Sequence, residues 1–312
     1  MRKLRWPFHE PCQTVRATLV FFANRTDFRY PKNYSFHFKK GALLKIGSQA
    51  HRSTAISASN SETIVVRGRD LAGELVGNIG FTDHFWLLVT GAMPSAAQRR
   101  VLDSTLVAIA EHGLVPSVQA SRMTLAAAPE ALQGAVAAGI LGCGSVVLGS
   151  SEAAGRFFAE IVERKKQGAS AVDSVQQVVR EYRAQRRAIP GYGHPLHKGY
   201  DPRAKRLFDV ATEVGCAGAH VEIAHEVERQ LPDLVGKKLA VNVSGAIPAV
   251  LLDAGYPLLA LKGVPILART AGLIAHLLEE QLRPIGFVLS HAAEQAIGYD
   301  GEAPAGFKPS DE

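Results

Sequence analysis

Cysteine is scarce in this sequence, and long apolar runs are missing from it. The chain of 312 residues holds three cysteines, Cys12, Cys143 and Cys216, and no CxxC pair. This argues against a disulfide framework and against a zinc site built on thiolates, and it favours a reducing, cytoplasmic compartment. No run approaches the roughly 20 apolar residues that cross a bilayer, so we expect no membrane partner.

Acidic residues are nearly absent from the first fifty positions. Residues 1–50 contain ten Lys and Arg against two acids, Glu10 and Asp27. This segment carries about +8, which leaves about −2 for the rest of a chain whose net charge is +6. The basic balance therefore belongs to the N-terminal segment, and we expect no nucleic-acid partner for the body.

The same fifty residues lack any helical or alternating period, although they hold nine of the 22 aromatic residues. Three interpretations compete: a targeting peptide, an ordered arm packed on the body, or upstream sequence before the true start. The third is favoured, although the next methionine, Met93, already lies inside the body. We expect residues 1–50 to be a disordered or mis-started extension that does not contribute to the fold.

Apolar residues recur at helical spacing from about Ile56 onward, which indicates an all-α body. Strands are expected only at 63–67 and 238–243. Asp70 and Thr82 are expected to cap helices, and Gly191–Pro202 cannot be regular because Gly, Pro and His crowd it. The other expected helices cover 94–111, 129–142, 151–167, 170–185, 204–214, 219–230, 245–254 and 264–281.

Chemistry-bearing residues concentrate in the irregular stretch IPGYGHPLHKGYDPRA, residues 189–204. Gly191 and Gly193 allow a backbone to approach a flat or anionic ligand closely. His194 can donate a hydrogen bond to a carbonyl oxygen and change protonation near neutral pH. Lys198 and Arg203 supply cations, and arginine is the better clamp for a carboxylate. A plain turn between helices is the alternative, but this combination outweighs it.

The stretch resembles the GxGH…DPR signature of the citrate synthase superfamily almost residue for residue. The resemblance implies that His194 hydrogen-bonds the keto oxygen of oxaloacetate or the hydroxyl of citrate, and that Arg203 binds a carboxylate. It also implies contact of coenzyme A with the backbone of Pro190, Gly191, Tyr192 and Gly193, and of its phosphate with Lys198.

Two further blocks are similar to the same family, and the resemblance runs from about Ile56 to Glu302. The block from Glu111 to Arg122, with Ser117 inside it, resembles a segment whose histidine, here His112, binds substrate. Residues 268–276, ARTAGLIAH, resemble a helix whose arginine, here Arg269, binds a second carboxylate. His276 is interpreted as structural.

The sequence departs from citrate synthases at two places. They use a second histidine on the thioester carbonyl, yet none occurs between His112 and His194. The citryl-CoA lyase domain of ATP citrate lyase lacks it too, which favours the lyase branch.

The second departure is at the catalytic aspartate, which lies in an NVDG segment in the lyases. This chain has Ser244 in Asn-Val-Ser-Gly instead, and serine has no useful basicity near pH 7. A plain helix cap is the favoured role of Ser244. Arg283 is a weak candidate for the arginine that the family donates across its dimer.

We therefore expect a citrate synthase-like fold with a large domain from residues 51–154 and 251–312 and a smaller helical domain from 155–250. The implied function is cleavage of a citryl-CoA-type thioester into acetyl-CoA and a keto acid. The alternatives are condensation by a citrate synthase, or a non-catalytic homologue that binds coenzyme A or a polycarboxylate. The thioester is a substrate, and no metal or permanent cofactor is implied. We expect a homodimer. The catalytic candidates are His194, His112 and Ser244, with His112, Arg203 and Arg269 on the substrate carboxylates.

Overall fold

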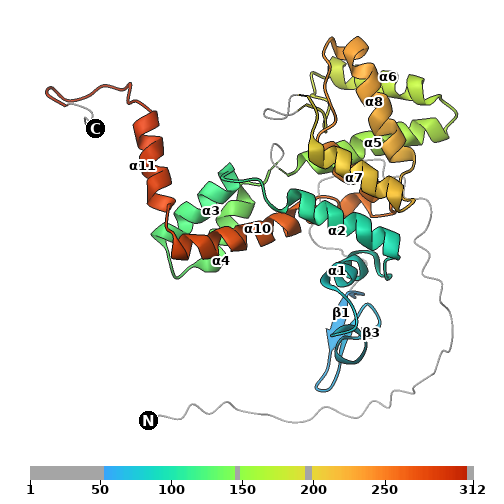
Figure 1. The fold of residues 1–312 in the computed structure, drawn as a ribbon, viewed down its shortest axis with the longest axis horizontal. Coiled ribbons are helices and arrows are strands. Elements are labelled where there is room, and N and C mark those ends of the chain that lie inside the picture. Colours follow the sequence, from blue (N-terminus) through green and yellow to red (C-terminus); the bar gives the residue numbers. More distant parts are fainter. Residues whose placement is uncertain (1–52, 145–147, 194–198, 308–312) are drawn as a thin grey trace. The chain divides into compact units, whose positions relative to one another are not determined.

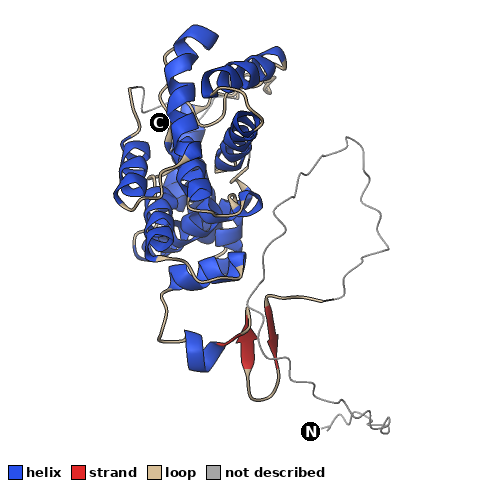
Figure 2. Ribbon diagram, turned by 90° about the vertical axis from the view of Figure 1, so that its right-hand side faces the viewer, coloured by secondary structure: helices blue, strands red, loops and turns tan. Residues whose placement is uncertain are grey.

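The computed structural model describes residues 53–144, 148–193 and 199–307 (Figure 1). The basic segment 1–50, His194 and Lys198 therefore lie outside the described residues. The chain divides at Ser53, and residues 54–312 form one compact unit. The all-α prediction is confirmed in outline, because helices dominate this unit and strands occur in one short segment ahead of them (Figure 2).

That segment is a small antiparallel sheet, which the sequence indicated only in part. Strands β1 (Ser57–Ser59), β2 (Ile64–Val66) and β3 (Arg69–Asp70) lie in the order β1-β2-β3. Arg67 and Gly68 turn the chain between β2 and β3 with φ of 49° and 81°, the left-handed values that a two-residue hairpin requires. The Arg67 guanidinium donates to the carbonyl of Leu88, which ties the sheet to the first α-helix.

Helices occupy most of the remaining described chain. A short π-helix, η1, is capped by the Asp70 carboxylate as predicted, and a 3-10 turn, η2, precedes α10. The bounds are η1 Leu71–Leu75, α1 Phe81–Thr90, α2 Ala96–Ala110, α3 Pro116–Ala127, α4 Leu132–Leu141, α5 Ser150–Lys166, α6 Ala171–Ala184, α7 Pro202–Glu213, α8 Ala219–Val235, α9 Val243–Asp253, η2 Leu258–Ala260, α10 Gly263–Leu282 and α11 Gly286–Ala296.

The main core surrounds the apolar helix α9, which packs against α5, α7 and α8. Phe157, Phe158, Ile247 and Leu251 are fully buried there. The long helix α10 packs instead against α2, α3 and α4. Helix α2 touches both α7 and α10, so it connects the surroundings of α9 with those of α10, and the candidate site forms around its C-terminal end.

Several sequence expectations need correction. Thr82 does not cap a helix: α1 begins at Phe81 after Gly80, and the Thr82 hydroxyl bonds Asp103 instead. Residues 238–243 form no strand but a single bridge between Tyr192 and Val241. Helices α3 and α11 were not anticipated, and α4 begins at Leu132 rather than at Pro129. The predicted division into a large and a small domain stays a prediction.

The expectation of no membrane-length apolar run was wrong for one segment. Within the described residues, Leu258–Leu282 is long and apolar enough to cross a membrane by length and composition alone. Its packing against α2, α3 and α4 and the charged Arg269 at its middle are features of a core helix. This segment is weak evidence for a membrane, since core helices pass the same test.

Candidate functional site

The glycine-rich stretch begins by pairing with the segment that leads into α9. The Gly193 N–H donates to the carbonyl of Ala240 at 2.8 Å, and the Asn242 N–H donates to the carbonyl of Gly191 at 2.9 Å. The backbone N–H and carbonyl of Tyr192, between them, take no part in these bonds. The structure therefore brings Pro190–Gly193 and the Asn-Val-Ser-Gly segment together, although about fifty residues separate them in the chain.

Two glycines make this approach possible. Gly191 has a φ of +86°, and a Cβ on it would lie 2.7 Å from the Cα of Gly245. A Cβ on Gly245 would lie 2.6 Å from the carbonyl oxygen of Gly191. Both distances are too short for real atoms, so neither residue tolerates a side chain. The sequence interpretation assigned the freedom of Gly191 to ligand approach; in the structure it serves the close packing against α9.

Asn242, which the sequence analysis did not single out, is the cap of α9. Its side-chain oxygen accepts from the Gly245 N–H, while its Nδ2 donates to the Gly193 carbonyl at 2.6 Å. The predicted capping role of Ser244 is therefore wrong: Ser244 is the second residue inside α9 and is partly buried. It lies in the first helical turn, where the helix dipole favours negative charge. An Asn three residues before the glycine whose N–H it receives is a recognisable cap pattern.

Tyr192 contributes its side chain to the core. Its hydroxyl donates to the carbonyl of Ala224 at 2.8 Å, and its ring meets Phe158 edge to face. Burial raises the pKa of this phenol well above its ordinary value. The side chain thus anchors the stretch in the core and does not face a ligand.

Arg203 lies in the first turn of α7 and grips Asp201. Its Nε and Nη2 donate to the two carboxylate oxygens of Asp201 at 3.0 and 2.9 Å. Asp201 also caps α7 and accepts from the Val243 N–H at 2.9 Å. Burial raises the pKa of Asp201, but the hydrogen bonds from Arg203 and Val243 outweigh it and hold the pKa below the usual value. Asp201 therefore fixes the starts of α7 and α9 together and orients Arg203.

Beside Arg203 runs an open groove of about 530 Å³ between α2 and α7. Arg203 and Ala108 both line it. Ala108 is next to Ile109, whose carbonyl accepts from Arg269. The groove beside Arg203 thus reaches the last turn of α2, and Arg269 of α10 donates to a carbonyl in that turn.

Arg269 is buried, and no carboxylate among the described residues pairs with it. Only 3% of the residue is exposed, and its one hydrogen bond within the described part of the chain runs from Nη2 to the Ile109 carbonyl at 3.3 Å. Its Nε and Nη1 have no partner among the described residues. A guanidinium held out of water with donors unused is costly, so this group is prepared for an anion that the described protein does not supply.

Two buried side chains accompany Arg269. Ser117, on α3, is buried, and its hydroxyl lies beside the Cys143 thiol without a well-formed hydrogen bond in the described part of the chain. Cys143 lies next to both: burial raises the pKa of its thiol, and the nearby Arg269 charge lowers it in part. Ser117 belonged to the motif seen in the sequence, but nothing in the sequence pointed to Cys143.

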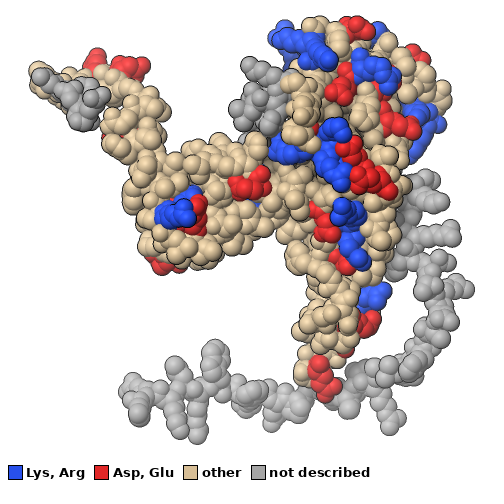
Figure 3. Space-filling model, in the orientation of Figure 1, with Lys and Arg blue, Asp and Glu red and all other residues tan. Residues whose placement is uncertain are grey.

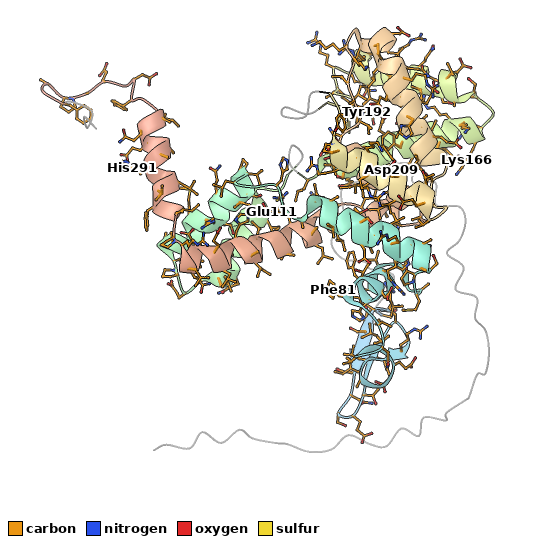
Figure 4. The ribbon with its side chains drawn as sticks, in the orientation of Figure 1. Phe81, Glu111, Lys166, Tyr192, Asp209 and His291 are labelled. Carbon is orange, nitrogen blue, oxygen red and sulfur yellow. The ribbon has the colours of Figure 1, made fainter. Side chains whose placement is uncertain are left out.

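His112 lies in the turn after α2, next to the C-cap residue Glu111, and is partly buried. Its N–H donates to the Glu111 carboxylate, whose other oxygen contacts His276 on α10 at 3.0 Å. Figure 4 shows Glu111 at the junction of α2 and α10. The interpretation of His276 as structural matches this contact. This carboxylate therefore joins the turn that carries His112 to the helix that carries Arg269.

Arg122, ten residues after His112, is fully occupied by protein. It donates to Glu280 at 2.6 Å, to Glu279 at 2.7 Å and to the carbonyl of Arg283 at 3.0 Å. Arg283 thus contributes its backbone here, and its candidate role toward a substrate stays a prediction. This network fastens α3 to the end of α10.

The carboxylates nearest in sequence to Ser244 and to the missing histidine are engaged elsewhere. Asp253 accepts from the N–H groups of Gly218, His220 and Val221, so it caps α8. Glu152 pairs with Arg156 one turn along α5. In the described ranges no three His, Cys, Asp or Glu side chains come close enough to hold a metal ion.

Comparison with known proteins assigns the fold. The chain is similar to the citryl-CoA lyase of Hydrogenobacter thermophilus, with 34% identity and a TM-score of 0.72 over 82% of this chain and 97% of that one. The ATP citrate lyase of Methanothrix soehngenii, solved with citrate and coenzyme A, shares the fold at 22% identity and a TM-score of 0.65, over 93% of this chain and 48% of that one.

Citrate synthases match over a shorter stretch. That of Synechocystis sp. is 27% identical over 208 residues, which are 65% of this chain and 50% of that protein. The chain thus spans about half the length of this relative. The family model for the citrate synthase C-terminal domain matches residues 80–285, about two thirds of the sequence. Together with the helical architecture around the two arginines, this match shows that the chain belongs to the citrate synthase family.

Proposed function

We propose that this protein is a citryl-CoA lyase-type enzyme, which cleaves a hydroxyacyl-CoA of the citryl-CoA type into acetyl-CoA and a keto acid of the oxaloacetate type. The observation that carries the proposal is Arg269, a buried guanidinium whose Nε and Nη1 have no described partner. A substrate carboxylate supplies the missing charge and accepts two hydrogen bonds in the geometry that arginine favours. The similarity to a citryl-CoA lyase over nearly that protein's whole length supports the direction of the chemistry.

Three groups around the end of α2 would hold the keto-acid half of the substrate. Arg269 takes one carboxylate, Arg203 offers its remaining Nη1 edge to another, and His112 completes the set. Asp201 keeps Arg203 in one orientation, so little side-chain freedom is lost when substrate binds. The coenzyme A portion would meet the backbone N–H and carbonyl of Tyr192, which have no partner among the described residues, with Lys198 on its phosphate.

In the proposed reaction His194 accepts the proton of the tertiary hydroxyl. The oxygen's electrons form the keto C=O bond, the adjacent carbon–carbon bond breaks, and its electron pair leaves with the acetyl-CoA enolate. A water near Ser244 gives a proton to the enolate carbon and is itself reprotonated by the proton that His194 accepted, so the hydroxyl proton is balanced by the new C–H bond. Position 244 is in the first turn of α9, whose positive dipole end favours the negative charge that develops there.

We also propose a homodimer built on α10. Ile274, Leu278 and Leu282 follow one another at four-residue spacing on α10 and are 52%, 58% and 73% exposed. Charged side chains gather over α5–α8, whereas the surface of α3, α10 and α11 is mostly uncharged (Figure 3). An uncovered apolar stripe of this kind suits a second copy of the chain. Light scattering at micromolar concentration should give the dimer mass, and a monomer mass contradicts the proposal.

The decisive experiment is an assay of CoA release and acetyl-CoA formation with a panel of hydroxyacyl-CoA thioesters. We expect turnover of the citryl-CoA type, abolished by His194→Ala. Binding of oxaloacetate and coenzyme A with no turnover of any panel member would replace the lyase by the non-catalytic alternative. Faster condensation of acetyl-CoA with oxaloacetate than cleavage would favour a citrate synthase.

Substitution of Ser244 offers a second way to distinguish cleavage from condensation. Wild-type protein, with serine there, should exchange the acetyl-CoA methyl protons slowly in heavy water. Ser244→Asp should raise that exchange, since general-base help is typically worth about 10²–10⁴-fold. Because Asn242 supplies the cap, Ser244→Thr is a matched control and should leave exchange unchanged. Rapid exchange by the wild type would show that another residue supplies the base.

A further inference from the structure

The carboxylate of Glu111 holds together the two elements that carry His112 and Arg269. One oxygen, Oε1, accepts the N–H groups of His112 at 2.8 Å and Gly113 at 2.6 Å. The other, Oε2, contacts Nε2 of His276 on α10 at 3.0 Å. The Glu111 side chain thus binds the turn after α2 through one oxygen and contacts α10 through the other.

The helices meet most closely at the same place. A Cβ on Gly272 of α10 would lie 2.3 Å from the carbonyl oxygen of Ala110 and 3.0 Å from Oε2 of Glu111. His276 stands one turn beyond Gly272, and Arg269 stands seven residues before His276. Positions i and i+7 lie on one face of a helix, so Arg269 and His276 both face the end of α2. The contact between Glu111 and His276 therefore bears on the position of Arg269, along the α10 axis, relative to His112.

Glu111 makes more contacts than a partly exposed carboxylate requires: two backbone N–H groups and a histidine nitrogen. Nearly half of its side chain is exposed to solvent. Partial burial raises its pKa, yet the hydrogen bonds from His276, Gly113 and His112 outweigh that effect and bring the pKa below the ordinary value. The C-terminal end of a helix leaves carbonyls without partners, not N–H groups, so capping the end of α2 does not explain why Glu111 receives two N–H groups from the following turn.

We propose that Glu111 and His276 form a positioning clamp, which sets the separation of His112 and Arg269 so that both reach the same polycarboxylate. Neither side chain need touch the substrate. The inference rests on the proposed function, because it takes His112 and Arg269 as ligands of the keto acid. It assigns to His276 a role in substrate affinity in addition to packing.

The test compares the binding of two ligands by calorimetry. His276→Leu removes the donor to Glu111, and His276→Gln puts back an amide N–H that can reach the same oxygen. We expect His276→Leu to weaken oxaloacetate binding about tenfold, since small misplacements of binding groups are costly, with coenzyme A binding and the thermal midpoint unchanged. His276→Gln should recover most of the oxaloacetate affinity. Glu279→Gln, on the same helix but toward Arg122, should change neither affinity.

Each remaining outcome decides against the clamp in a distinguishable way. Unchanged oxaloacetate affinity in His276→Leu overturns it while leaving the proposed function intact. Equal losses for both ligands, or a lowered thermal midpoint without rescue by His276→Gln, show that His276 only packs. A wild-type protein that binds coenzyme A but no polycarboxylate overturns the assignment of Arg269 and His112, and the clamp with it.

Discussion

Two arginines are almost equally buried in this protein, and their surroundings are opposite. Arg122 on α3 is 2% exposed and Arg269 on α10 is 3% exposed. Arg122 meets two carboxylates and a carbonyl, and Glu280 in turn accepts the N–H groups of Ile285 and Gly286. Arg269 meets one carbonyl and leaves two nitrogens unused. Both helices pack together, so the difference is not one of location in the fold.

The comparison separates a structural charge from one kept for a ligand. A buried charge is tolerated when partners replace the water it has lost. Described residues provide these partners for Arg122, but they leave Nε and Nη1 of Arg269 without any. We infer that folding accepts the cost at Arg269 because binding recovers it, which is a common feature of functional sites.

The largest effect is expected from breaking the network that Arg122 forms with Glu279, Glu280 and the Arg283 carbonyl. Arg122→Met leaves Glu280 buried without its counter-charge, so the free energy of unfolding should fall by about 3–5 kcal/mol. Urea unfolding measures this loss. Arg122→Met combined with Glu280→Gln should recover part of it, because the orphaned carboxylate is gone. A loss below about 1 kcal/mol for Arg122→Met would contradict the structural role.

Arg269→Met should give the reverse pattern. Stability without ligand should stay the same or rise, because an uncompensated buried charge is removed. Oxaloacetate affinity should fall about 100-fold, which corresponds to about 3 kcal/mol for hydrogen bonds to a charged group. Thermal shift with and without oxaloacetate reports both quantities at once. A destabilisation as large as that of Arg122→Met would erase the distinction between the two arginines.

Acid should weaken the network that Arg122 forms with Glu279 and Glu280. Burial raises the pKa of Glu280, but hydrogen bonds from Arg122, Gly286 and Ile285 outweigh it, so the folded-state pKa lies below the ordinary value of 4.5. The stability it contributes is therefore complete above about pH 4.5 and is lost as the pH falls through the lowered pKa. Urea midpoints of wild type and Glu280→Gln should differ at pH 7 and converge in strong acid. Convergence of the midpoints at high pH instead would mean that folding raises the pKa of Glu280, which contradicts the prediction.

The smallest effect belongs to Arg203, which stands between the two cases because Asp201 partners it on an open groove. Arg203→Lys keeps the charge but loses the two-point contact with Asp201. We expect oxaloacetate binding to weaken by about tenfold or less, equivalent to about 1.4 kcal/mol, with a small change in stability. Calorimetry measures the affinity, and wild-type affinity would mean that Arg203 only orients α7.

Most helices were recognisable from apolar spacing, because burial of one face imposes a period that the chain displays locally. Helix α2 shows this, with its Ser95 cap and capping box. Helix α11 was missed because its large apolar residues, such as Phe287 and Val288, are exposed and give no buried face to read. Residues 238–243 were mistaken for a strand because the single bridge to Tyr192 depends on a segment about fifty residues away.

The sequence by itself determined the family signature, the helical class and the side chains able to bind carboxylates, since these depend on residue types and local spacing. Only the tertiary structure decided which arginine is used by the protein and which is left for a ligand. It also decided that Asn242, and not Ser244, caps α9, and that Glu111 joins α2 to α10. These outcomes depend on partners distant in sequence, because the state of a buried charge is set by the atoms that replace its water.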